Sequence, residues 1–139
     1  MLKPVLEDVL KKGNIKDAKV IEEICIGNVL QPGAGSTSSR MAQFLAGIPN
    51  TTPLYAIDRL CSSGLQAVAC VAGQIASGQI EIGIGGGVES MSMFAMTNMV
   101  DPNALSEQVF EHEEAQKCLM PMGITSENVA SKYGITRQQ

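Results

Sequence analysis

A strand, a helix and a second strand follow one another between residues 53 and 84, and this succession restricts the fold more than any other feature of the chain. Residues 53–58 and 80–84 are short apolar runs typical of buried strands. Between them, residues 62–77 carry apolar side chains at helical spacing, and Gly78 follows as a stop. Two strands joined in this way are expected to run parallel with a right-handed crossover. The segment predicts an α/β sheet.

The residues before this unit add elements of the same kind. Residues 2–10 repeat apolar side chains at helical spacing, and Gly13 ends the predicted helix. Residues 23–30 read as a buried strand, residues 31–35 as a flexible loop, and residues 37–46 as a further helix. Helices and strands therefore alternate along the first part of the chain.

The last third of the chain has a different character. After Gly87 it becomes rich in methionine and polar side chains, with helices predicted over residues 104–117 and 126–133. Ser126 is the expected cap of the second of these, and Thr136 is expected to open a helix in which the chain stops. These residues are interpreted as loops and helices laid over the sheet.

Composition excludes several classes of function. The net charge is −4 and no Lys/Arg cluster occurs, so we expect no nucleic acid partner. No apolar run approaches the roughly 20 residues that span a bilayer, and no signal peptide or other targeting address is visible, so we expect no membrane span. Four cysteines without a CxxC pair and one histidine predict no metal site and reduced thiols.

Cys61 is the candidate nucleophile, because it lies where a strand ends and a helix begins. This position exposes a side chain at the carboxyl edge of a sheet, where α/β enzymes bind ligands. Unpaired N–H groups at a helix start favour a thiolate, and Gly64 leaves room for a reacting carbonyl. The alternative is a buried, packing cysteine. Cys25, inside a strand, and Cys70, inside a helix, are interpreted as packing residues.

Two other patterns have structural explanations. Gly83, Gly85 and Gly87 follow a strand, but a dinucleotide-binding GxGxxG motif would require glycine at position 88, where Val88 stands. Close backbone packing explains these glycines without a phosphate ligand. The methionines of the last third either fill core gaps or line an acyl channel, with Met122 as the best candidate for the second role.

Three motifs carry a resemblance to a known family. Residues 58–67, Asp-Arg-Leu-Cys-Ser-Ser-Gly-Leu-Gln-Ala, closely resemble the acyl-enzyme signature of thiolases, Asn-Arg-x-Cys-Ser-Ser-Gly-Leu-Gln-Ala. Residues 86–92 and 121–130 resemble two further thiolase segments in the expected order. Nearly the whole chain is similar to the first half of a thiolase subunit, and its amino-acid sequence most resembles the peroxisomal 3-ketoacyl-CoA thiolases.

The resemblance implies an acyltransferase of fatty acid β-oxidation. The Cys61 thiolate would take an acyl group from a 3-ketoacyl-CoA and release acetyl-CoA, after which coenzyme A would receive the shortened acyl chain. Coenzyme A acts here as a substrate, and no cofactor is implied. The resemblance also implies a homodimer and a peroxisomal location, with mitochondrial and cytosolic locations left open.

The resemblance further divides the chain. Residues 1–93 would form an incomplete thiolase-like N-terminal domain of α/β fold, with α/β/α layers around a mixed, mainly parallel sheet and the nucleophile at its edge. Residues 94–139 would begin the loop region that covers coenzyme A, with Met122 touching substrate. A complete subunit of this family has five α/β/α/β/α layers built from two similar halves, so we expect a truncated chain with uncovered apolar faces.

The chain also departs from the family pattern. Asp58 stands where the family usually has asparagine, and a charge there would disfavour a nearby thiolate. The family also has Gly-His-Pro, Asn-Glu-Ala-Phe and Cys-x-Gly motifs in the other half of its subunit. The first two do not occur in this sequence, and its Cys25-Ile26-Gly27 run lies in the predicted strand 23–30. His112, flanked by Glu111 and Glu113, is interpreted as a solvated surface residue rather than a substitute base. The alternative function is therefore an inactive fragment, or a thiolase-like half that acts only with a partner chain.

Overall fold

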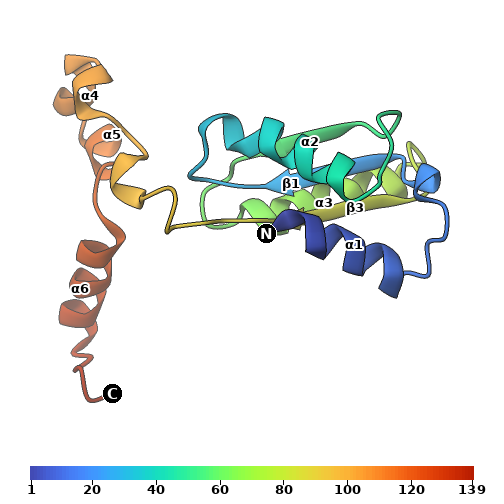
Figure 1. Cartoon of the computed structure of the whole chain (residues 1–139). Helices are drawn as coiled ribbons and strands as arrows, with labels where there is room; N and C mark the ends of the chain where they lie inside the picture. The colour runs from blue at the N-terminus through green and yellow to red at the C-terminus, as the bar shows by residue number, and fades with distance from the viewer. The chain divides into compact units, whose positions relative to one another are not determined.

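The computed structural model describes residues 1–139, apart from the side chain of Asn98. The chain divides into two compact units, Met1–Met99 and Val100–Gln139 (Figure 1). The first unit holds the sheet, and the second is built from helices alone. No helix among the described residues combines the length and apolarity needed to cross a membrane.

A three-stranded parallel sheet forms the centre of the first unit. Its strands are β1 (Glu23–Gly27), β2 (Leu54–Ile57) and β3 (Gly83–Gly87), in the order β2-β1-β3. The helix that joins β2 to β3 therefore crosses over β1. The expected parallel α/β sheet is confirmed.

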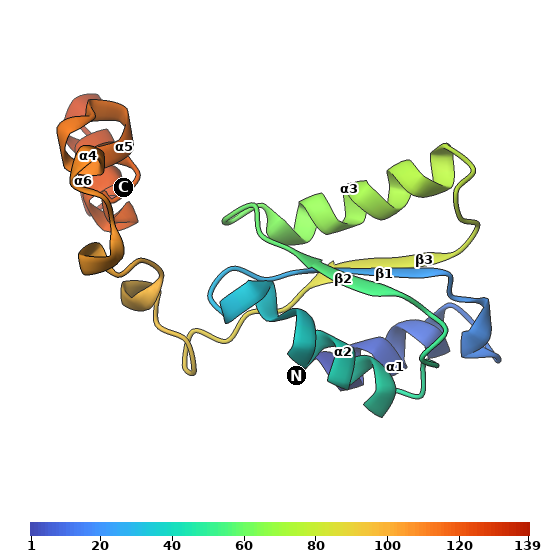
Figure 2. The same ribbon diagram turned by 90° about the horizontal axis from the view of Figure 1, so that it is seen from above.

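Helices cover both faces of this sheet. Figure 2 shows α3 (Ser63–Ala76) on one face and α1 (Leu2–Lys12) and α2 (Ser36–Leu45) on the other. The 3₁₀ turns are η1 (Ala18–Val20), η2 (Pro32–Gly35) and η3 (Met96–Asn98). The unit thus has three layers, α/β/α, as predicted.

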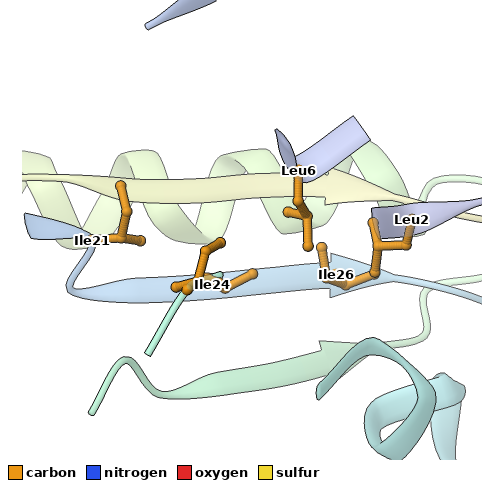
Figure 3. Packing of buried hydrophobic residues seen from close by; sticks show 6 residues of the cluster. Leu2, Leu6, Ile21, Ile24 and Ile26 are labelled. Atoms are coloured by element: carbon orange, nitrogen blue, oxygen red, sulfur yellow. The ribbon is translucent and has the colours of Figure 1, made fainter. Parts of the chain in front are cut away.

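The central strand β1 supplies core residues to both faces. Ile24 and Ile26 are fully buried on one face, where they pack with Leu2 and Leu6 of α1 (Figure 3). Cys25, pointing to the other face, packs with buried side chains of α3. Successive strand residues point to opposite faces, so a central strand is apolar at every position.

Strand β3 lies three residues further along the chain than its apolar residues indicated. The prediction of 80–84 was wrong, because the glycine run itself pairs with β1. A Cβ on Gly85 would lie 2.7 Å from the Cα of Val68 in α3. The glycines are therefore strand residues that let α3 lie against the sheet, and their lack of side chains hid them from a hydrophobicity pattern.

The other strands and helices of the first unit lie close to their predicted ranges, with one shortened strand. β1 ends at Gly27 rather than at residue 30. Large side chains on the outer faces of the helices remain exposed, as expected, with Leu45 at 67% and Leu65 at 75%.

The second unit differs more from the expected helices. It contains η4 (Pro102–Ala104), α4 (Glu107–Glu111), α5 (Glu113–Lys117) and α6 (Met122–Tyr133).

The predicted helix 104–117 breaks at His112. The backbone of His112 is extended, and its Nδ1 accepts a hydrogen bond from the Ala115 amide at 3.4 Å. Ser126 lies inside α6, which starts at Met122 after Pro121. Thr136 is followed by a turn, in which the Gln139 side chain accepts from its amide at 2.8 Å.

Two adjacent glycines of β3 offer a matched test of the contact with α3. Gly85→Ala should lower the free energy of unfolding by about 1–3 kcal/mol, because the new Cβ would overlap backbone that cannot rotate away. A Cβ on Gly86 would meet no atom within 4 Å, so Gly86→Ala should change stability by less than about 1 kcal/mol. Urea unfolding followed by circular dichroism measures both, and equal losses would contradict the contact.

Candidate nucleophile site

Cys61 lies in the tight turn between β2 and α3. The turn begins after Ile57, the last residue of β2, and α3 begins at Ser63. Cys61 is exposed, as a nucleophile must be, and is not a buried packing residue. Leu60, just before it, has a φ of 48°, in the left-handed region that side chains rarely adopt. Such strain persists where the surrounding contacts fix the backbone.

Polar side chains on both sides of Cys61 fix this turn. Asp58 Oδ1 accepts a hydrogen bond from the Leu60 amide at 2.8 Å. Ser63 is only 3% exposed, and its hydroxyl accepts from the Arg59 amide at 2.8 Å and donates to the Leu60 carbonyl at 2.6 Å. The left-handed residue is therefore held through both its amide and its carbonyl.

The role of Asp58 follows from this geometry. An acceptor oxygen two residues before an amide forms an Asx turn, which aspartate and asparagine both make. Asp58 thus supplies the hydrogen bond that an asparagine would supply, and it adds a negative charge three residues before Cys61.

The first turn of α3 rests directly on the ends of two strands. A Cβ on Gly27, the last residue of β1, would lie 2.4 Å from the Ser63 carbonyl carbon. A Cβ on Gly87, the last residue of β3, would lie 3.2 Å from the Cα of Gly64. Only glycine permits this approach of backbone to backbone. The helix start is therefore located by the carboxyl edge of the sheet.

The other cysteines lie in different surroundings. Cys25 is fully buried in β1, and burial raises the pKa of its thiol. Cys70 is half-buried in α3 beside the Cys25 cluster and accepts a hydrogen bond from Gln66 Nε2 at 3.4 Å. Both match the packing role expected for them. Cys118 is exposed in the second unit, where it follows the last residue of α5.

The remaining predicted residues belong to the second unit. His112 is exposed and caps α5, as expected for a surface residue. Met122 is the first residue of α6 and is 55% exposed, and its contact with substrate stays a prediction. No group of three or more histidine, cysteine, aspartate or glutamate side chains placed to hold a metal occurs in the described part of the chain.

Two supporting residues were not singled out from the sequence. Gly27 was read as an ordinary strand residue, although a glycine at the end of an apolar run is a signal of close backbone approach. Ser63 is the first residue of α3, and its buried hydroxyl closes the turn. A serine near a helix start is a known capping signal, but here the hydroxyl bonds backward into the turn.

Comparison with known proteins gives a consistent set of relatives. The thiolase N-terminal domain model matches residues 1–139. Rat peroxisomal 3-ketoacyl-CoA thiolase B is 51% identical over 139 residues, which are 100% of this chain and 32% of the rat protein. The human peroxisomal 3-ketoacyl-CoA thiolase is 50% identical over the same length, again 32% of that protein. The chain therefore spans about a third of the length of these relatives.

Solved structures agree with the sequence matches. The dimeric peroxisomal thiolase of Saccharomyces cerevisiae superposes with a TM-score of 0.85 at 44% identity, covering 98% of this chain and 35% of that one. The Bacillus anthracis acetyl-CoA acetyltransferase gives a TM-score of 0.72 at 31% identity, covering 96% of this chain and 36% of that one. The fold is shared with both.

Alkylation should separate the cysteines by their surroundings. With limiting iodoacetamide, Cys61 should react about threefold faster than Cys118, because helix starts favour a thiolate and helix ends disfavour it. Cys25 should react last, since its raised pKa keeps the buried thiol protonated to higher pH. Mass spectrometry of peptides gives the order, and preferential labelling of Cys70 or Cys118 would count against this site.

Asp58→Asn should keep the turn and remove its charge. The new amide oxygen can still accept from the Leu60 amide, so stability should hardly change. Alkylation of Cys61 should become about two- to fivefold faster, because a nearby negative charge opposes the thiolate. Asp58→Ala is the matched variant that removes the charge and the acceptor together. If Asp58→Asn and Asp58→Ala destabilised the chain equally, the acceptor role of Asp58 would be wrong.

Proposed function

Because the chain belongs to the thiolase family, we propose that it supplies the acyl-accepting cysteine of an acyltransferase that cleaves 3-ketoacyl-CoA. The observation that carries the proposal is the exposed Cys61, held at the start of α3 on the carboxyl edge of a parallel sheet. This residue occupies the nucleophile position of the thiolase signature in residues 58–67.

The reaction would proceed through a thioester on Cys61. The thiolate attacks the 3-keto carbon, the bond between C2 and C3 breaks, and C2 takes up a proton, which releases acetyl-CoA. The sulfur of coenzyme A then attacks the thioester carbonyl and receives the shortened acyl chain, and Cys61 leaves as the thiolate. No electrons change hands, so the two steps need an acid, a base and oxyanion donors, and no oxidant.

This chain supplies the nucleophile and part of its setting. Its one histidine, His112, is exposed in the helical second unit. A base that activates Cys61 and donors for the thioester oxygen would come from residues beyond the third of the relatives' length that this chain spans. This observation favours the second candidate, a thiolase-like half that turns over only when a partner segment completes it.

Substrates, assembly and location follow from the relatives. We propose acyl-CoA and coenzyme A as ligands, since the rat and human relatives are named 3-ketoacyl-CoA thiolases. Their names also support a peroxisomal location and a place in β-oxidation. The yeast structure is of a dimeric thiolase, which supports a homodimer for the completed subunit. Residues 94–139 would form the start of the region covering coenzyme A, with Met122 against the substrate.

A chimera tests the proposal directly. The matching third of Saccharomyces cerevisiae peroxisomal thiolase is replaced by this chain, and thiolysis of acetoacetyl-CoA is measured. We expect turnover that falls by about a thousandfold or more in Cys61→Ser, as expected when a nucleophile is removed. Cys118→Ser, which also removes an exposed thiol, should keep the activity.

The isolated 139-residue chain provides the contrast. It should show no turnover with acetoacetyl-CoA or longer 3-ketoacyl-CoA, because it holds one histidine and this is exposed. Turnover by the isolated chain that Cys61→Ser abolishes would contradict the need for a completing segment. A folded chimera that is active without Cys61 would contradict the function itself.

A further inference from the structure

Asn28 lies where all three strands end. Gly27, Ile57 and Gly87 are paired in register as the last residues of their strands. The Asn28 amide, immediately beyond, donates to the Ile57 carbonyl at 3.1 Å. Its side-chain Nδ2 donates to the Val88 carbonyl. Asn28 is 1% exposed and therefore ties β1 to both neighbouring strands at the carboxyl edge.

Glu89 completes this junction with its carboxylate. Oε1 accepts from Asn28 Nδ2 at 3.2 Å, and Oε2 accepts from the backbone amides of Val29 at 2.9 Å and Leu30 at 3.4 Å. No salt bridge to Glu89 is found among the described side chains, and the N–H groups of Asn28, Val29 and Leu30 donate to its carboxylate. Hydrogen bonds to a charged acceptor are roughly twice as strong as neutral ones.

The junction lies next to Gly27 and Gly87, the strand ends that support the first turn of α3 and the turn that carries Cys61. Asn28 follows Gly27, against which Ser63 packs, and Val88 follows Gly87, against which Gly64 packs. The Val88 amide also donates to the Gly27 carbonyl at 3.0 Å. Movement of either strand end would therefore move the surface on which the first turn of α3 rests.

We infer that Asn28 and Glu89 are positioning residues for Cys61, acting through the strand ends Gly27 and Gly87. The pair, called here the edge clamp, fixes the height and tilt of the first turn of α3 and with it the turn that carries the thiol. The inference rests on the proposed function in one respect, that Cys61 is the acyl acceptor. The mechanical link from the edge clamp to the turn stands on contacts alone.

The edge clamp is more than a general stabiliser of the sheet. The buried β1 residues of the two apolar clusters are Ile24, Cys25 and Ile26, which precede the end of the strand. The edge clamp instead places the Glu89 carboxylate at the carboxyl edge, where it accepts from the Asn28 side chain and from the Val29 and Leu30 amides. Its loss should therefore act first on the nearby turn.

The full 139-residue chain carrying Glu89→Gln tests the inference. An amide has one acceptor oxygen, so it cannot serve both Asn28 Nδ2 and the amides of Val29 and Leu30. Amide chemical shifts of residues 58–64 should change, and Cys61 alkylation should slow about threefold as the helix start moves away from the thiol. Cys118, in the second unit, is the internal control and should keep its rate.

A rescue variant separates positioning from simple damage. The rescue variant combines Asn28→Asp with Glu89→Gln. The side-chain amide at position 89 then donates to the carboxylate at position 28, and the oxygen of that amide accepts from the backbone amides of Val29 and Leu30. Part of the lost Cys61 rate should return, because the carboxylate at position 28 regains a donor from position 89 but cannot donate to the Val88 carbonyl. Glu127→Gln removes the same charge from an exposed position in α6 and should alter neither readout.

Several outcomes would overturn the inference. These are shifts confined to residues 28–31, a Cys61 rate that does not change, equal slowing of Cys61 and Cys118, or a double variant no better than Glu89→Gln. If Glu89→Gln does not fold, Glu89→Asp, which keeps the charge but shortens the reach by one methylene, is judged by the same shifts and rates. Failure of the proposed function is distinguishable, because an inactive chimera leaves the shift changes in residues 58–64 intact.

Discussion

Contact of backbone with backbone, where the first turn of α3 meets the ends of β1 and β3, is the constraint on which the rest of the first unit depends. A Cβ on Gly27 would lie 2.4 Å from the carbonyl carbon of Ser63. Both atoms are fixed by the backbone, so neither can rotate away as a flexible side chain could. The helix therefore cannot start elsewhere without leaving the sheet. Because Cys61 lies two residues before that start, the sheet helps to determine its position, together with the hydrogen bonds of Asp58 and Ser63 within the turn.

This constraint explains why polar groups gather at one edge. Side chains are excluded where the strands end against α3, so the chain satisfies its amides with Asn28, Glu89 and Asp58 just beyond. Carboxyl ends of parallel strands meet at one edge, and helix starts with unpaired N–H groups face it. In the proposed reaction, a thiolate and an incoming thioester carbonyl would both gain from donors directed toward this edge.

The sequence predicted the sheet and the position of Cys61 between β2 and α3 better than the elements around them. Apolar runs at β1 and β2 and helical spacing in α3 carried enough signal, and Cys61 followed from their junction. β3 was misplaced because Gly83–Gly87 stabilise it by backbone pairing and close packing, which no hydropathy pattern registers. Two helix boundaries in the second unit were mispredicted because local caps override the helical periodicity. The His112 side chain caps α5, and Pro121, not Ser126, precedes the first residue of α6. The edge clamp depends on contacts between residues about 60 positions apart, which spacing along the chain cannot reveal.

The division between what this chain holds and what it lacks has a physical basis. A nucleophile must be positioned to within fractions of an ångström, and a three-layer unit with a buried β1 provides that by itself. Under the proposed function, the acid, the base and the oxyanion donors would act on the far side of the reacting carbonyl and would approach from outside this unit. The exposed Leu45 and Leu65 on its outer helices leave apolar surface of the kind that another segment or subunit covers. Completion of the site and burial of this surface would then be one event, which couples activity to assembly.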